Sequence, residues 1–182
     1  MPQLTPHHSN KNKDIRVQYT IELKEKQLFI KFTVKNSPIS TNASFLKDGW
    51  GNIGLWDYDV VEVFVQFSDQ ADGHYLELQV SPLSQKFALL IKRPRVEVEK
   101  VTNLKSEASG SESENGFEAL FKIDYRDIPG KAKTKTNIIK AGLFACLGKG
   151  EGRNFFALNI NTEAQADFHR PELFKEIGRY ES

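Results

Sequence analysis

The sequence of 182 residues holds a single cysteine, Cys146, so no disulfide can form within the chain. Cys146 stands in the apolar run 141–147, which favours a buried, inert thiol. No apolar run approaches the roughly 18 residues of a membrane-spanning helix. The polar first 14 residues lack the apolar centre of a secretory signal. We therefore expect no membrane partner, and a cytoplasmic location is the most compatible one.

The sequence also lacks an excess of either charge. It contains 25 Lys and Arg residues against 24 Asp and Glu residues, for a net charge of +1. Such a chain has no overall field that would gather phosphate backbones, so we expect no nucleic-acid partner. Two local basic stretches remain, which are Lys92–Arg95 and the set Lys131, Lys133, Lys135 and Lys140. Acidic residues stand close to both, which is typical of solvated strand ends and loops.

Motifs of nucleophilic, metal and phosphate chemistry are missing as well. The sequence has no G-x-S-x-G, no zinc-ligand spacing and no glycine-rich phosphate loop. We therefore expect no metal and no cofactor, and we regard His7 and His8 as too weak a pair to hold a metal. An enzyme would need paired carboxylates, for which Glu62 and Glu77 are the best candidates. Carboxylates on an exposed sheet face are common, so we expect no catalytic activity.

What the chain has is alternation with a period of two. Apolar residues take the odd positions of Ile15–Leu23 and the even positions of Leu28–Val34, which predicts a hairpin. Further strands are expected over 59–67, 75–82, 87–92, 96–101, 117–125, 138–147 and 154–160. Only Pro171–Ile177 suggests helical turns, with proline at the first position. The pattern predicts an all-β fold, an antiparallel β-sandwich of about nine or ten strands with at most short helical turns.

The expected organisation is one domain. Residues 1–14 predict a flexible polar tail, and residues 15–182 a single sandwich domain. Lys105–Asn115 is poor in apolar residues and rich in Ser and Glu, so we expect a mobile loop there. The connection 37–58 carries three glycines and both tryptophans, and a loop of this length is often functional.

One face of the predicted strands 59–67 and 75–82 is polar yet flanked by aromatic rings. Glu62, Gln66, Glu77 and Gln79 alternate with Phe64 and Tyr75, and Trp56 stands just before. A saccharide needs both kinds of group, because its C–H face stacks on a ring and its hydroxyls need fixed polar partners. An ordinary solvated face, with Trp56 as a core anchor, is the alternative interpretation.

Four segments resemble carbohydrate-binding module family nine, a group within the wider DOMON-like sandwiches. Leu55–Phe64 (LWDYDVVEVF) is similar to its "W, acid, then V-E-V-F" signature, and Tyr75–Pro82 to its next strand. Phe117–Pro129 is similar to its alternating strand followed by I-P, and Asp167–Phe174 to its closing F-H-x-P-x-x-F motif. The order and spacing fit over roughly residues 15–180, and together the segments are fairly specific.

The resemblance implies a sandwich that binds saccharides without cleaving them. In the family, two tryptophan rings clamp a terminal sugar, and Trp56 and Glu62 stand where one ring and one hydroxyl-binding acid would stand. The second ring is expected shortly before the closing motif, where Phe156 is the candidate, with Trp50 as another. The resulting ligand-binding set is Trp56, Glu62, Gln66, Glu77, Gln79 and Phe156.

Other functions stay open at this point. A DOMON-like binder of another small molecule and an interaction module with a vestigial sugar site are the alternatives; haem is disfavoured because Met1 is the only methionine. Lys140 or Arg153 could supply donors to a sugar. In the closing motif we expect Phe168 and Phe174 to plug the sandwich end, Pro171 to fix a turn, and His169 to hydrogen-bond backbone.

Overall fold

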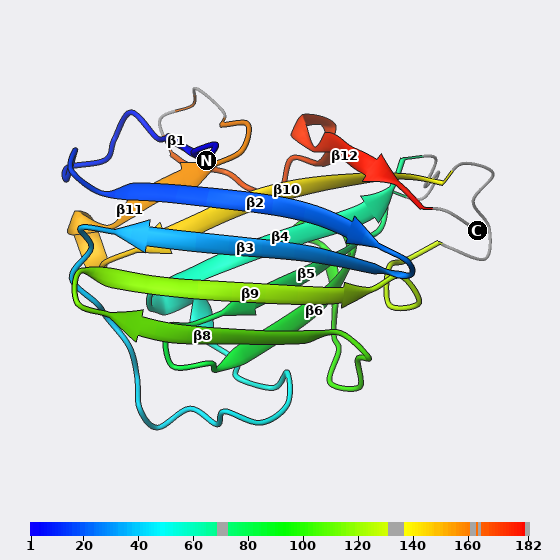
Figure 1. The fold of residues 1–182 in the computed structure, drawn as a ribbon, viewed down its shortest axis with the longest axis horizontal. Helices are drawn as coiled ribbons and strands as arrows, with labels where there is room; N and C mark the ends of the chain where they lie inside the picture. The colour runs from blue at the N-terminus through cyan, green and yellow to red at the C-terminus, as the bar shows by residue number, and fades with distance from the viewer. Residues whose placement is uncertain (69–72, 131–136, 161–162, 164, 181–182) are drawn as a thin grey trace.

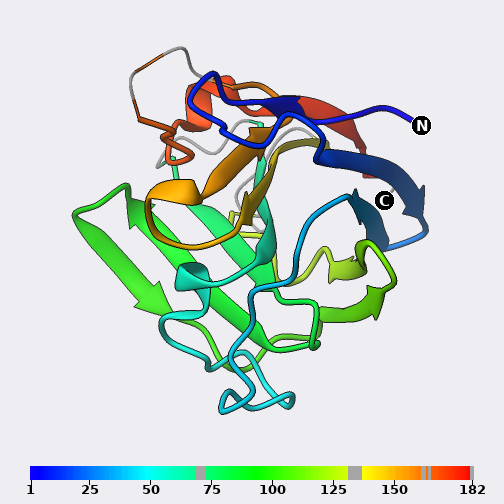
Figure 2. The ribbon, with the colours of Figure 1, turned by 90° about the vertical axis from the view of Figure 1, so that its left-hand side faces the viewer.

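Two antiparallel sheets face each other in the computed structural model, which describes residues 1–68, 73–130, 137–160, 163 and 165–180 (Figures 1 and 2). These residues form 12 strands, and their only helical elements are three isolated 3-10 turns. The predicted all-β sandwich is confirmed. No helix in the described ranges is long and apolar enough to cross a membrane.

The smaller sheet has the strand order β2-β3-β9-β8. It comprises β2 (Arg16–Lys24), β3 (Gln27–Lys35), β9 (Gly116–Asp124) and β8 (Glu107–Ser113). The predicted hairpin joins β2 to β3, with Leu23 opposite Leu28. In β3 every second residue is buried, as the even-position apolar pattern requires, and the other residues are intermediate or exposed.

The larger sheet has the order β1-β11-β10-β4-β5-β6-β7, with β12 also beside β10. Its strands are β1 (Thr5–Pro6), β4 (Val60–Phe67), β5 (Tyr75–Val80), β6 (Lys86–Arg93), β7 (Glu97–Lys100), β10 (Ile138–Leu147), β11 (Asn154–Ala157) and β12 (Lys175–Arg179). Strands β11 and β12 pair with different halves of β10, so they lie in succession along one edge of that strand.

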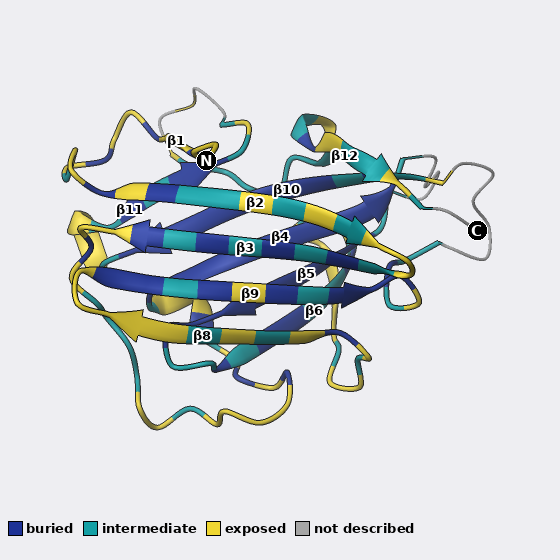
Figure 3. Cartoon of the chain, in the orientation of Figure 1, coloured by how far each residue is buried: buried dark blue, intermediate teal, exposed yellow. Residues whose placement is uncertain are grey.

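The main core lies between the sheets. It takes the alternating apolar residues of β3, β9, β4, β5 and β10. Every residue of β4 and β5 is buried, including those on the face turned away from the smaller sheet. Figure 3 shows this contrast, since β4 and β10 are almost wholly dark blue while β2 and β8 carry exposed positions. The outer face of the larger sheet is therefore covered.

The first residues differ from the expected flexible tail. Strand β1 pairs with β11, and Leu4, His7 and Asn10 are buried. The Asn10 side chain donates to the Phe155 carbonyl and accepts from the Phe155 N–H, both at 2.8 Å, as a neighbouring strand would. A few such contacts order a polar segment whose composition alone suggests none.

The predicted loop Lys105–Asn115 contains strand β8, which forms the edge of the smaller sheet. A Cβ on Gly110 would lie 2.1 Å from the Ser81 carbonyl oxygen, so only glycine permits this close approach. At the start of the segment, Ser106 Oγ donates to Asp127 at 2.6 Å. Exposed Ser and Glu side chains suit an edge strand, which explains why composition concealed it.

The 3-10 turns are η1 (Leu55–Asp57), η3 (Gly150–Gly152) and η4 (Pro171–Leu173). The last confirms a turn begun by Pro171, but the chain then enters β12 rather than a second helical turn. In the basic stretch 92–95, Lys92 and Arg93 pair with Glu97, and Arg95 pairs with Asp167. Lys131, Lys133 and Lys135 lie outside the described residues.

Candidate ligand-binding site

A cavity of about 470 Å³ opens on the outer face of the larger sheet. Its floor is formed by alternate residues of β4 and β5, namely Glu62, Phe64, Glu77 and Gln79. Its walls come from η1, the β6–β7 hairpin, the β10–β11 connection and the segment 166–169. Four elements that are distant in sequence thus enclose a floor made by two neighbouring strands.

The floor follows directly from strand register. Glu62 lies opposite Gln79, and Phe64 lies opposite Glu77. Opposite residues of an antiparallel pair point to the same face about 5 Å apart, so Glu62 and Glu77 are diagonal neighbours. The intervening residues Val61, Val63 and Leu78 point the other way and join the main core.

Aromatic rings cover the outer face beside this floor. The rings of Phe64 and Tyr75 stack with centroids 5.5 Å apart, and Phe144 and Phe168 stack at 4.3 Å. Phe174 belongs to the same cluster. The prediction that Phe168 and Phe174 plug the end of the sandwich is therefore wrong. They cover the face of the sheet, because β10 offers an aromatic partner there.

Gly142 makes room for that cluster. A Cβ at this position would lie 2.5 Å from the Phe144 ring and 2.9 Å from the Phe174 ring. Any larger side chain at 142 would therefore require these rings to shift. The glycine therefore allows the closing segment of the chain to lie flat on β10.

His169 closes one side of the cavity. Its Nδ1 lies 2.6 Å from the Tyr75 hydroxyl, whereas the sequence predicted a backbone partner. Burial lowers the pKa of His169 and raises that of Tyr75, so both side chains are neutral at physiological pH. The Tyr75 hydroxyl and Nδ1 therefore share a hydrogen bond between two neutral groups, and the His169 ring lies against Phe64 with centroids 5.3 Å apart.

The two floor carboxyls are taken out of water. Glu62 is 4% exposed and Glu77 is 3% exposed. Burial raises the pKa of Glu62 to about 7, an effect that the nearby Arg153 guanidinium opposes. Burial raises the pKa of Glu77 to about 8, and the Glu62 charge adds to the rise. Near neutral pH the pair therefore carries less than its full negative charge.

Several floor atoms have unused hydrogen-bonding capacity. Gln79 Nε2 donates to Glu77 Oε1 at 2.7 Å, and Cys146 Sγ lies 3.8 Å from Glu62 Oε1. Glu77 Oε2 and Gln79 Oε1 are buried with no hydrogen-bond partner in the described part of the chain. Buried polar atoms are nearly always paired, so these two atoms are the ones that a molecule in the cavity could satisfy.

Arg153 fixes the wall that carries Trp56. Its Nη2 donates to the carbonyl oxygens of Trp56 and, at 2.9 Å, of Tyr58. Asp59 reinforces this wall, because its carboxylate accepts from the backbone N–H groups of Gly148 and Ser40. The Trp56 ring packs on Phe87 with centroids 5.2 Å apart and stays 37% exposed. It therefore presents an aromatic surface at the rim.

The structure brings together four of the six predicted site residues, namely Trp56, Glu62, Glu77 and Gln79. Gln66 is buried on the same strand but lies opposite Lys140, and neither residue lines the cavity. Of the two proposed donors, only Arg153 lines it. The alternative of an ordinary solvated face is wrong, because the covering segments bury all four polar residues of this face.

The two residues expected to supply the second aromatic ring of a sugar clamp do not line the cavity. Phe156 and Trp50 both lie in the core between the sheets, so neither can contact a ligand in the cavity. Phe155 lines the cavity instead, because alternation along β11 puts it on the face opposite to that of Phe156. Sequence reasoning also missed Phe168, although the closing motif contains it, and Cys146, whose apolar neighbours suggested the main core.

Among the described residues no cluster of three or more His, Cys, Asp or Glu side chains could hold a metal ion. The polar groups of the cavity are carboxyl, amide, thiol, imidazole and guanidinium. They can bind a small polar molecule by hydrogen bonds and ring contacts.

No family model matches the sequence. The UPF0462 protein C4orf33 homolog of Danio rerio is 31% identical over 130 residues, which make up 68% of this chain and 61% of that protein. The chain thus spans about three fifths of the length of this relative.

Solved structures resemble the chain over nearly its whole length. A candidate carbohydrate-binding protein from Bacteroides uniformis matches with a TM-score of 0.69 and 15% identity over 94% of this chain and 83% of that one. A family nine carbohydrate-binding module from Caldicellulosiruptor kristjanssonii matches with a TM-score of 0.62 in each of two complexes. In its complex with glucose, the identity is 14% over 98% of this chain and 86% of that one. In its complex with cellotriose, the identity is 16% over 100% of this chain and 84% of that one. The chain therefore has the β-sandwich fold of family nine carbohydrate-binding modules, as its four sequence segments predicted.

Proposed function

We propose that this chain is a non-catalytic carbohydrate-binding module and that the cavity on the larger sheet is its binding site. One observation carries the proposal: the buried acceptors Glu77 Oε2 and Gln79 Oε1 have no described partner and lie in a cavity with the exposed Trp56 ring at its rim. A sugar matches both features, since its hydroxyls donate hydrogen bonds and its C–H face stacks on a ring.

The size of the cavity suits one or two sugar rings at the end of a chain. About 470 Å³ lies within the usual range of small-molecule sites, roughly 300–1,000 Å³. Glu62, with Arg153 nearby, offers acceptors to vicinal hydroxyls through charge-assisted bonds, which are stronger than neutral ones. The family nine module of this fold, which is seen in complex with glucose and with cellotriose, also supports the proposal.

The arrangement of the carboxyls supports binding without cleavage. Glycoside hydrolysis by paired carboxylates needs one group on each side of the scissile bond. Glu62 and Glu77 instead stand side by side on adjacent strands of one floor. A sugar above them meets both from the same side.

Tryptophan fluorescence tests the proposal cleanly, because the chain has two tryptophans in different settings. Trp56 lies at the rim, whereas Trp50 is buried in the core with its Nε1 donating to the Ser106 carbonyl at 3.3 Å. Titration with glucose and cellotriose should change the emission, with a dissociation constant on the order of 0.1–1 mM. In Trp56→Phe only Trp50 still emits, and the response should disappear.

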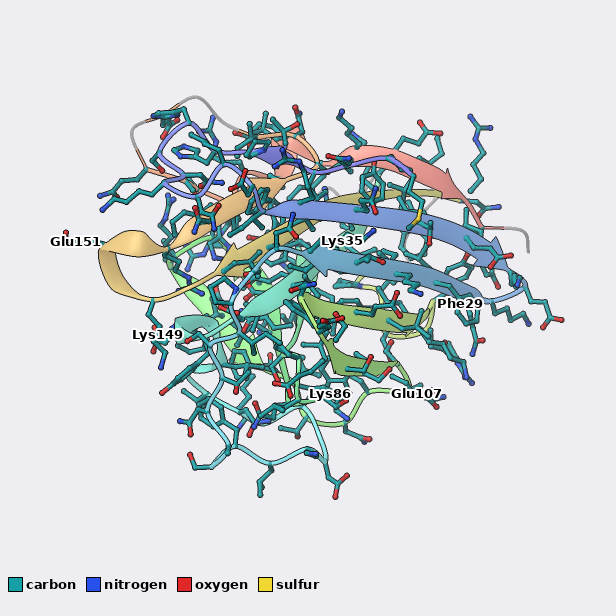
Figure 4. All side chains as sticks on the ribbon, turned by 60° about the vertical axis from the view of Figure 1, so that its left-hand side comes forward. Phe29, Lys35, Lys86, Glu107, Lys149 and Glu151 are labelled. Carbon is teal, nitrogen blue, oxygen red and sulfur yellow. The ribbon has the colours of Figure 1, made fainter. Side chains whose placement is uncertain are left out.

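Binding itself is then measured by calorimetry on Glu62→Ala, which should weaken sugar binding at least about tenfold, or 1.4 kcal/mol. The exposed Glu151, labelled on the β10–β11 connection in Figure 4, provides the matched control Glu151→Ala. The proposal fails if neither sugar binds at tens of millimolar, the result expected of a vestigial site. It also fails if Glu62→Ala binds as tightly as the control.

A further inference from the structure

Glu62 and Glu77, the two carboxyls of the cavity floor, differ in whether a cationic side chain lies near them. Arg153 acts on Glu62, but no cation of the described chain is among the groups that act on Glu77. The other guanidinium at the cavity belongs to Arg95, which is paired with Asp167 on the wall. Among the described residues, Glu77 is thus a buried acid without a cationic partner.

Hydrogen bonding isolates Glu77 in the same way. Its one partner is the Gln79 amide, whose Nε2 donates to Glu77 Oε1. Gln79 Oε1 and Glu77 Oε2 remain as two buried oxygens with no hydrogen-bond partner among the described residues. Both residues are more than nine-tenths buried and line the cavity. Among the described residues, the unpaired polar atoms at this end of the floor are therefore oxygens.

We propose that the saccharide bound here is an amino sugar, whose free ammonium group lies on Glu77 and Gln79. The inference rests on the proposed function and names the substrate class of the same site. An ammonium group has three donors and no acceptor, so it satisfies both orphan oxygens and brings no lone pair against a carboxylate. It also supplies the charge that Glu77 lacks, and buried charges are stable only when paired.

The aromatic surroundings favour the same ligand. Phe64 lies opposite Glu77 in the sheet, and Phe155 and Trp56 line the cavity. Ring faces attract cations, and the attraction strengthens where water is excluded. A neutral hydroxyl at the same place gains neither the ring attraction nor the full charge-assisted bond.

Binding of an ammonium group should change the protonation of Glu77. The ionisable groups that act on Glu77 or line the cavity are Glu62, Tyr75, Arg95, Cys146, Arg153, Asp167 and His169. In the free protein below neutral pH, Glu77 is held in its protonated form. An ammonium ligand favours the carboxylate, so binding releases the Glu77 proton to the buffer. Glucose brings no charge and should release none.

Calorimetry with glucose, glucosamine and N-acetylglucosamine at about pH 6, where amines are protonated, tests the inference. Glucosamine should bind at least about tenfold more tightly than glucose, equivalent to 1.4 kcal/mol. N-acetylglucosamine, which has no charge, should bind no more tightly than glucose. Repeating the titration in buffers of different ionisation enthalpy should reveal proton release with glucosamine alone.

Glu77→Gln keeps the shape of the side chain and removes its charge. In this variant the ratio of the glucose and glucosamine dissociation constants should fall to about one, whereas Glu151→Gln should keep the wild-type ratio. Glucose binding without a preference for glucosamine overturns the inference and leaves the proposed function intact. Tighter binding of N-acetylglucosamine also overturns it. Failure of all three sugars to bind overturns both proposals.

Discussion

The two faces of strands β4 and β5 are both buried, yet they are built from opposite kinds of residue. The inner face carries only aliphatic side chains in its centre, such as Val63 and Leu78, and meets the smaller sheet. The outer face carries Glu62, Glu77 and Gln79 between aromatic rings, and meets loops and a cavity. The inner face stabilises the fold, whereas the outer face buries polar groups at a cost in stability and lines the cavity.

The largest effect is expected on the inner face. Leu78→Ala removes a fully buried side chain from the main core and should lower the free energy of unfolding by about 2–5 kcal/mol. Urea denaturation measures the change. Leu120, which is 41% exposed on the smaller sheet, gives the control Leu120→Ala, whose cost should be well under that of Leu78→Ala. Equal costs at both positions would contradict the division between the two faces.

The buried carboxyls of the outer face should make the stability of the protein depend on pH. Glu62 and Glu77 have pKa values of about 7 and about 8 in the folded chain, above the ordinary 4.5, so the folded state binds more protons between these values. The free energy of unfolding should therefore fall as pH rises from 4.5 to 8, with a slope of up to about 1.4 kcal/mol per unit for each group.

Glu77→Gln should flatten this fall and should leave the protein more stable than the wild type at pH above that of the Glu77 transition. Thermal melts between pH 5 and about 9 measure both effects. Glu118, whose side chain is 46% exposed, supplies the control, since Glu118→Gln should keep the wild-type slope. A variant Glu77→Gln with an unchanged slope would show that the buried carboxyl is not the source.

The polar pair of the cavity wall should contribute less. His169→Ala and Tyr75→Phe each break the 2.6 Å hydrogen bond between these residues, and each should cost about 1–3 kcal/mol. Because both changes remove the same bond, their effects should not add in the double variant. Chemical denaturation of the four proteins gives the coupling, and strict additivity would argue against the bond.

The smallest effect is expected on the outer face of the smaller sheet. Lys31 Nζ and Glu118 Oε1 lie 2.9 Å apart, with both side chains more than 40% exposed. Exposed ion pairs contribute about 0–1 kcal/mol, and salt screens them. Glu118→Gln should therefore change the urea midpoint only slightly, and less still at high salt. A loss that persists at high salt would show that the pair is shielded from solvent.

The strands in which apolar and polar residues alternate strongly could be predicted from the sequence, and so could the cavity floor that two of them form. Glu62 and Gln79 could be placed on one face because neighbouring strands fix their register. The strands β1, β8 and β12 could not be predicted, because their residues are polar edge residues without a period-two apolar pattern.

The walls of the cavity could not be predicted from the sequence, for a different reason. Phe155 and Phe156 are adjacent and identical in type, so the choice between core and cavity depended on the unknown phase of β11. The Tyr75–His169 bond joins residues 94 positions apart, and nothing local to either one indicates the other. Contacts between loops and a sheet face are set by tertiary packing, which a single sequence does not display.

The way the cavity is assembled has a consequence for how such a molecule can change over generations. Its floor belongs to two strands whose other face is the core, so a substitution there must respect both sides of the sheet. Its rim comes from connecting segments, and the Arg95–Asp167 pair joins two of them at the cavity. Rim residues can therefore vary without refolding the sandwich. Related proteins could therefore keep the floor, which would contact one chemical group of the ligand, and change the rim to accept ligands that differ in their other groups.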